Sequence, residues 1–175
     1  MMEPIEVLLA EREIRRLITL FCRGADRADS TLLRSVLHDD AYIDSGPFKG
    51  GAGDFGAWAA GSTARRASQH LIANMLIEID GDHAEVETYC VALHGGVPCG
   101  AEVNDSTVFV RYLDQVDRRG GHWRISRHVV VWDWNHHMPS TACWEGPVYG
   151  QCTLRPKPGR NDPSYFELPL IGRLR

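Results

Sequence analysis

Two residues far apart in the chain have the types needed for acid–base chemistry. Asp26 follows Cys22 by four residues and Ile18 by eight, so a helix that continues this far turns the Asp26 carboxylate toward its buried side. A buried carboxylate must find a partner, because burying an unpaired charge costs free energy. His70 opens a stretch of alternating residues, and a neutral imidazole oriented by a carboxylate is a general base. From the residues alone, Asp26 as a solvated loop residue and His70 as a structural histidine remain open alternatives.

Other kinds of catalytic site lack their characteristic spacing. His136 and His137 are adjacent and so point apart, and no H-x-x-x-H or H-x-H pattern appears, so we predict no metal site. The chain has neither a G-x-S-x-G nor a G-x-G-x-x-G motif, and we predict no cofactor. The five cysteines include no C-x-x-C pair, which favours free thiols in a reducing cytoplasm over disulfides.

Composition narrows the class of protein. The 175 residues, 43% of them hydrophobic, suit one domain with room for a small-molecule pocket. A formal net charge of -4 gives no basic surplus, so we expect no nucleic-acid partner. No run approaches the roughly 20 apolar residues that cross a bilayer, and no leader pattern opens the chain, so we expect a cytoplasmic protein without a membrane partner.

From the N-terminus, the sequence predicts two helices, a short strand, a small helix and then four long strands. Apolar spacing predicts a long helix over 5–25, and Asp29 or Ser30 is suited to cap a second helix through "TLLRSVLH". "DDAYIDSG" reads as a short strand, and a Gly-rich loop leads to a small helix, "FGAWAA", with Asp54 as its cap. Four strands are predicted at 70–80, 83–95, 104–117 and 121–134, with "DGDH" and "DRRGGH" as turns.

This order predicts an α+β fold in which helices cover one face of a strongly bent antiparallel sheet. Residues 1–134 form the domain around the pocket, and the aromatic and Pro-rich tail 135–175 is expected to pack over the pocket or a neighbouring subunit. Strand alternation divides the last strand into two partly apolar faces. One face carries Ser126, His128, Val130, Trp132 and Trp134, and the other carries Trp123, Ile125, Arg127, Val129, Val131 and Asp133.

Four stretches resemble the SnoaL-like branch of the nuclear-transport-factor-2-like superfamily, the cone-shaped fold of scytalone dehydratase, hexachlorocyclohexane dehydrochlorinase, bile-acid dehydratase and ketosteroid isomerase. They are "EREIRRLITLFCRGADRAD", "LLRSVLHDDAYID", "SQHLIANMLIEIDGDHAEVETYCVALH" and "VFVRYLDQVDRRGGHWRISRHVVVWDW", within residues 11–134. The resemblance implies a cone-shaped α+β barrel. It also implies a catalytic dyad at Asp26 and His70, with Asp26 ending the first helix at the mouth of the cavity.

The chain departs from the family pattern at two places. Related lyases often have a polar residue five positions before the aspartate, where this chain has Phe21, and an arginine where it has His128. We expect His128, with Tyr112, to replace that arginine as a neutral donor or as an acid, and Asn74 to add a polar contact. Strand parity places the apolar walls at Phe21, Ile43, Ile72, Cys90, Val108, Val110 and Trp132.

The resulting expectation is a cofactor-independent lyase that eliminates water, halide or a small carbonyl fragment from a hydrophobic, aromatic small molecule. Two alternatives stay open. One is an isomerase or cyclase of the same fold, and the other is a non-catalytic binding subunit of the kind found in ring-hydroxylating oxygenases. A partly apolar outer sheet face also predicts a homodimer or homotrimer.

Overall fold

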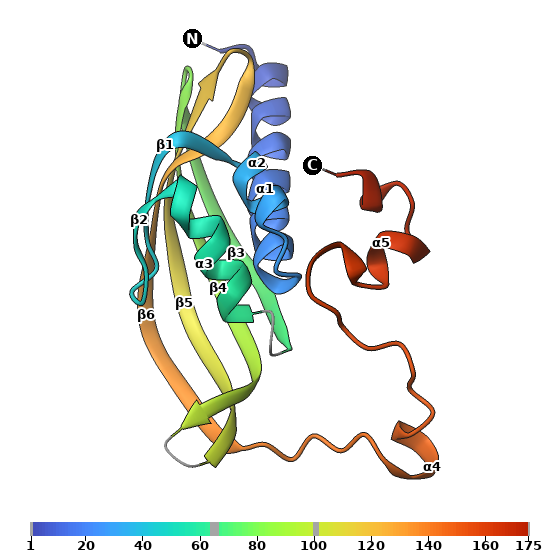
Figure 1. The fold of residues 1–175 in the computed structure, drawn as a ribbon. Helices are drawn as coiled ribbons and strands as arrows, with labels where there is room; N and C mark the ends of the chain where they lie inside the picture. Colours follow the sequence, from blue (N-terminus) through green and yellow to red (C-terminus); the bar gives the residue numbers. More distant parts are fainter. Residues whose placement is uncertain (1, 64–66, 100–101, 175) are drawn as a thin grey trace.

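The structure is a computed structural model that describes residues 2–63, 67–99 and 102–174. Three helices belong to its body (Figure 1): α1 (Pro4–Asp26), α2 (Ser30–Ser35) and α3 (Ala52–Thr63). The strands are β1 (Leu37–Asp44), β2 (Lys49–Gly51), β3 (Ser68–Asp80), β4 (His83–Cys99), β5 (Glu102–Arg119) and β6 (His122–Pro139). The C-terminal segment carries α4 (Gly146–Tyr149), η1 (Gly159–Asn161), α5 (Ser164–Glu167) and η2 (Ile171–Arg173). Within the described residues, no helix is long and apolar enough to cross a membrane.

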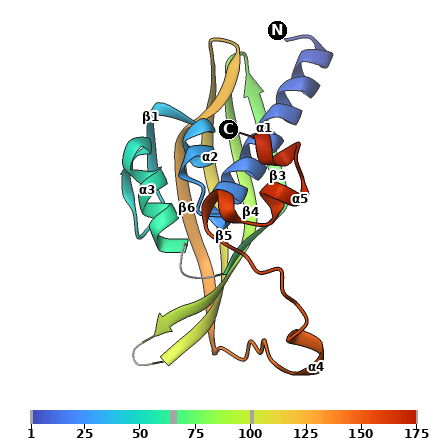
Figure 2. The ribbon, with the colours of Figure 1, turned by 45° about the vertical axis from the view of Figure 1, so that its right-hand side comes forward.

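The strands form one curved, open sheet in the order β2-β1-β6-β5-β4-β3. The three body helices lie on the same face of it, which confirms the predicted α+β cone (Figures 1 and 2). The sheet is not antiparallel throughout, because β1 pairs in parallel with β6. A parallel pair needs a long crossover, and the chain between β1 and β6 supplies it.

Helix α1 is held by a buried stripe at the spacing the sequence predicts. Its buried apolar side chains are Ala10, Ile14, Leu17, Ile18, Phe21 and Cys22. Ile5, Leu8 and Leu9, which the same pattern includes, are more than half exposed. Gly24 lets α2 lie close, since a Cβ there would meet Leu33 Cγ at 2.8 Å. The helix ends at Asp26, so the alternative of a carboxylate in a loop beyond the helix is wrong.

Several element boundaries differ from the prediction. The Asp29 side chain caps α2 by accepting from the Leu32 amide at 2.9 Å, but α2 stops at Ser35 and β1 begins at Leu37. Asp54 lies in the first turn of α3 and is not its cap, because α3 begins at Ala52. The four long strands all extend further, and β6 continues to Pro139. The short strand β2 lies in the predicted loop and pairs with β1.

Irregular pairing changes which side chains face the interior. In β3, the two residues Ala73 and Asn74 lie opposite a single residue of β4, which makes a β-bulge. The side chain just before the bulge and the one just after it therefore point to the same face of the sheet. In β6, the pairing with β5 skips Ser126 and Asp133. The irregularity at Ser126 turns Trp123 and Ile125 into the core, on the same face of the sheet as His128. Simple alternation predicts that they lie on the opposite face. After the second, Trp134 lies against Phe109 and is 57% exposed.

The C-terminal segment returns to the body of the same chain. The Tyr165 hydroxyl donates to Asp29 Oδ2 at 2.5 Å, and the Arg23 guanidinium lies over the Tyr165 ring, 4.7 Å from its centroid. The Gly159 amide donates to the Arg27 carbonyl. Burial, together with the bond to Asp29, raises the pKa of Tyr165 to about 12, so this hydroxyl keeps its proton. The tail is therefore anchored beside the turn between α1 and α2 (Figure 2).

Candidate active site

The end of α1 and the start of β3 bring Asp26 and His70 together. Asp26 Oδ1 lies 2.6 Å from His70 Nδ1, and Oδ2 accepts the backbone N–H of His70 at 3.0 Å. Both side chains are largely buried, at 12% and 13% exposure. Because Nδ1 is bound to the carboxylate, Nε2 is the ring nitrogen left for a substrate. This contact joins the two residues that the sequence singled out.

The pKa values of the pair shift in opposite directions. Burial alone would raise the pKa of Asp26, but the hydrogen bond and charge of His70 outweigh it, and the pKa is lowered. Burial alone would lower the pKa of His70, and the hydrogen bond and charge of Asp26 raise it above the ordinary 6.5. The two shifts have one cause, so the aspartate stabilises a positive charge on the imidazole.

Ser68 and His94 extend this pair, and the sequence reasoning missed both. The Ser68 hydroxyl donates to Asp26 Oδ1 at 3.0 Å and lies 3.2 Å from His94 Nδ1. The rings of His70 and His94 meet edge to face, with centroids 5.5 Å apart. Ser68 and His94 are direct partners across β3 and β4. The sequence does place Ser68 two residues before His70, and side chains at this spacing lie on the same face of a strand.

His70 borders a cavity of about 360 Å³ with mostly apolar and aromatic walls, here named the aromatic cavity. Helices α1 and α3 contribute Phe21, Phe55 and Trp58, and β3 and β4 contribute His70, Ala92 and His94. Strands β5 and β6 contribute Val108, Val110, Tyr112, His128 and Trp132. A cavity of this size with few polar groups suits a small molecule with an aromatic ring.

The predicted substrate-binding residues divide into two groups. Phe21, Val108, Val110, Tyr112, His128 and Trp132 line the aromatic cavity. The other predicted wall residues lie in the core. Ile43 is fully buried in the larger cluster of core residues, and Cys90 is buried in the smaller cluster, which also contains Tyr112. Ile72 is partly buried and packs against both clusters. Asn74 is exposed at the irregularity in β3 and lies outside the cavity wall. The missed α3 residues Phe55 and Trp58 follow the three-residue spacing of a helix in "DFGAWAA".

A second imidazole in the aromatic cavity is also held by a carboxylate. His128 Nδ1 lies 2.6 Å from Asp114 Oδ1, and these side chains are 2% and 0% exposed. The His128 ring packs against Phe21 and Tyr112, with centroid distances of 4.6 and 4.9 Å. Burial raises the pKa of Tyr112 well above its ordinary value, so its hydroxyl stays neutral.

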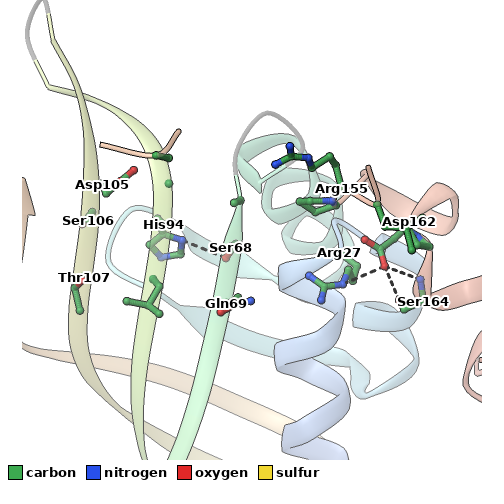
Figure 3. A pocket seen from close by; sticks show the side chains of 17 residues that line it. Arg27, Ser68, Gln69, His94, Asp105, Ser106, Thr107, Arg155, Asp162 and Ser164 are labelled. Atoms are coloured by element: carbon green, nitrogen blue, oxygen red, sulfur yellow. Dashed lines mark hydrogen bonds and ion pairs between the residues drawn. The ribbon is translucent and has the colours of Figure 1, made fainter. Parts of the chain in front are cut away.

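A second hollow, the tail chamber, lies between the body and the C-terminal segment and has a volume of about 590 Å³. Figure 3 shows His94 and Ser68 on one side of it and the Arg27, Asp162 and Ser164 group on the other. Arg27 Nε lies 3.4 Å from Asp162 Oδ1. His94 and Ser106 border both hollows, so the tail chamber adjoins the aromatic cavity. Over the described part of the chain, no three His, Cys, Asp or Glu side chains converge as a metal site would require.

Comparison with solved structures supports the fold. A putative scytalone dehydratase from Novosphingobium aromaticivorans matches with a TM-score of 0.64 and 18% identity, over 81% of this chain and 94% of its own. A type 2 hexachlorocyclohexane dehydrochlorinase (LinA) matches with a TM-score of 0.70 and 15% identity, over 83% and 99%. The Kfla4162 protein from Kribbella flavida matches with a TM-score of 0.59 and 26% identity, over 73% and 95%.

A comparison with curated proteins gives no match. The family comparison gives one: the model of the SnoaL-like domain matches residues 6–129, which span most of α1 to the middle of β6. This stretch contains Asp26, His70 and His128 together with the strands that position them. The chain therefore belongs to the SnoaL-like domain family of the nuclear-transport-factor-2-like superfamily.

Proposed function

We propose that this protein is a cofactor-independent lyase that uses His70 as its general base, oriented by Asp26. One observation carries the proposal: His70 borders the aromatic cavity while its Nδ1 lies 2.6 Å from a largely buried carboxylate. A carboxylate on Nδ1 fixes the tautomer in which Nε2 has a free electron pair. The dehydratase and dehydrochlorinase among the structural neighbours agree with this class of reaction.

The proposed step is a proton abstraction followed by elimination. His70 Nε2 takes a proton from a substrate carbon, the C–H electron pair forms a C=C bond, and the leaving group departs from the adjacent carbon. Asp26 stabilises the imidazolium that forms. A general base of this kind contributes about 10²–10⁴ in rate, and the apolar walls strengthen the remaining electrostatic interactions by excluding water.

The shape of the site favours an aromatic substrate. Phe21 and Phe55 stack with centroids 5.7 Å apart, and Trp58 continues the aromatic wall 6.0 Å from Phe55. An aromatic wall of this kind suits a flat ligand, because aromatic rings gain from stacked and edge-to-face contacts. The leaving group in this proposal is water, halide or a small carbonyl fragment.

Product mass tests the proposal. Purified protein treated with a chelator is incubated with aromatic alcohols, diaryl compounds, halides and sterols, and products are followed by mass spectrometry. We expect a product lighter by the mass of the leaving group, and strong loss of this activity in His70→Ala and Asp26→Asn. A product of unchanged mass would instead identify an isomerase or cyclase. Activity that survives both substitutions would remove the dyad from the mechanism.

A further inference from the structure

The tail chamber carries a positive charge for which the proposed base does not account. Arg155 belongs to the C-terminal segment and lines the chamber on the side across from Ser68 and His94 (Figure 3). We propose that the tail chamber binds the carboxylate of an aromatic acid at Arg155, while the ring of the same molecule occupies the aromatic cavity. This inference rests on the proposed function in taking that acid as the substrate. It narrows the substrate class to aromatic compounds with an acidic side chain.

Arg155 is a cation whose contacts within the described part of the chain include no carboxylate. Its guanidinium carbon lies 3.6 Å from the centroid of the Trp144 ring, and Nη2 donates to the Tyr149 carbonyl at 3.4 Å. Its Nη1 is buried and has no hydrogen-bond partner among the described residues. A buried donor without an acceptor costs free energy, and a guanidinium can donate two parallel hydrogen bonds to one carboxylate. An acidic ligand therefore supplies the partner that the chain does not.

The other arginine and aspartate side chains of the tail chamber already have partners. Arg27 Nε lies 3.4 Å from Asp162 Oδ1, so these two charges offset each other. Asp105 accepts a backbone amide through Oδ1 and the Ser140 hydroxyl through Oδ2, each at 3.1 Å. Both carboxylates are thus used within the chain. Of the arginine and aspartate side chains described in the lining, Arg155 remains for a ligand.

A row of three polar side chains lies between the tail chamber and the aromatic cavity. Ser68, His94 and Ser106 are direct partners across β3, β4 and β5. His94 and Ser106 border both hollows, and the His94 ring lies 5.5 Å from the ring of His70. A ligand that lies across this row passes beside His70. Its ring can then contact the apolar walls while its acidic end reaches the tail chamber.

The C-terminal segment supplies the side of the chamber that carries Arg155. Trp144 and Arg155 both come after residue 129, where the match to the SnoaL-like domain ends. The bond from Tyr165 to Asp29 fastens the same segment to the body of the protein. The group that selects an acid therefore lies outside the matched domain, and it can set the substrate preference without altering the Asp26–His70 pair.

Binding measurements test the inference without turnover. The probes are ω-phenylalkanoates from phenylacetate to 6-phenylhexanoate and their primary amides, titrated calorimetrically into the purified protein. Each acid and its amide share the same ring and chain, so the ratio of their dissociation constants reports on the carboxylate alone. At the chain length that spans the two hollows, we expect the acid to bind about 10-fold more tightly than the amide. Amides that bind as tightly as the acids at every chain length would overturn the inference.

Arg155→Gln tests which residue holds the carboxylate. We expect it to weaken the binding of the acid by about 10-fold and that of the amide by less than about 2-fold, because it removes the charge and keeps a polar side chain. Arg173→Gln is the matched control, since Arg173 is exposed in the same segment and does not line the chamber. It should change neither affinity. Equal weakening of acid and amide in Arg155→Gln, or an unchanged preference for the acid, would overturn the inference.

His70→Ala separates this site from the proposed base. The variant should keep the preference for the acid over the amide, because Arg155 and not His70 holds the carboxylate. Loss of the preference in His70→Ala would place the carboxylate at the imidazole and overturn the inference. A preference that depends on Arg155, in a protein that eliminates nothing from any substrate of the panel, would support the acid site and refute the proposed lyase.

Discussion

Asp26 uses both of its carboxylate oxygens on His70, one on the ring and one on the backbone. The backbone contact fixes the start of β3 against the end of α1, and the ring contact fixes the imidazole tautomer. Ser68 adds a third hydrogen bond to the same carboxylate. Three hydrogen bonds keep the ionised form of Asp26 favourable despite its burial, which is why its pKa is lowered.

The opposite pKa shifts predict the pH dependence of the enzyme. His70 acts as a base only when neutral, and its pKa is raised above 6.5, so kcat/KM should rise with pH through an apparent pKa above that value. Asp26→Asn removes the negative charge that stabilises the imidazolium, so the rise of kcat/KM should occur at lower pH. The maximum kcat/KM that is reached at high pH should fall by roughly 10²–10⁴. A pH–rate profile of both proteins checks this. A limb at the same pH in both would contradict the coupling.

Trp132 and Asn74 show how strand irregularities decide the cavity wall. Trp132 lines the aromatic cavity, and its indole N–H donates to the Ser45 carbonyl at 3.3 Å, whereas Asn74 is exposed outside it. We predict that Trp132→Ala weakens the binding of an aromatic ligand by about 10-fold, because it removes a large apolar surface from the site. Asn74→Ala should change binding by less than about 2-fold. Calorimetric titration of both variants would refute this assignment if the two losses were equal.

At the level of elements, the apolar periodicity and turn residues predicted α1 and the four long strands, because these depend on local spacing. The irregularities did not follow from local spacing. The hairpin after Asp80 pairs Met75 with Thr88, and undisturbed pairing would place Ser68 opposite Gly95. The extra residue at Ala73–Asn74 shifts the pairing by one and so brings His94 opposite Ser68. Regular alternation of side chains along the strands does not predict this contact. The parallel β1–β6 pair is equally non-local and could not be read from either strand.

The C-terminal segment gives a prediction about the attachment of the tail. The Tyr165 hydroxyl bonds to buried Asp29, while Tyr149 is 55% exposed in the same segment. Tyr165→Phe leaves Asp29 with one hydrogen bond fewer, at a cost of about 1–3 kcal/mol for a buried group. We expect faster cleavage of the tail in limited proteolysis, with Tyr149→Phe unchanged as the control. Equal cleavage rates in all three proteins would show that this bond does not hold the tail.

At the scale of the molecule, we propose that the uncovered sheet face is buried against further copies of this chain. The body helices cover the other face, and Leu71, Leu76, Tyr89, Leu93 and Leu113 are exposed on this one. Exposed apolar patches of this kind favour association. Light scattering after gel filtration should give a dimer or trimer, and Leu113→Arg should shift it to monomer. A monomer at micromolar concentration in the unsubstituted protein would contradict the proposal.

The measurement that tests the central claim most directly is the product mass from an aromatic substrate panel with unsubstituted protein, His70→Ala and the surface control His83→Gln. The account predicts a product lighter than its substrate by the leaving group. It predicts the same rate in His83→Gln and a rate lower by roughly 10²–10⁴ in His70→Ala. Elimination at the same rate in His70→Ala would contradict the assignment of His70 as the base.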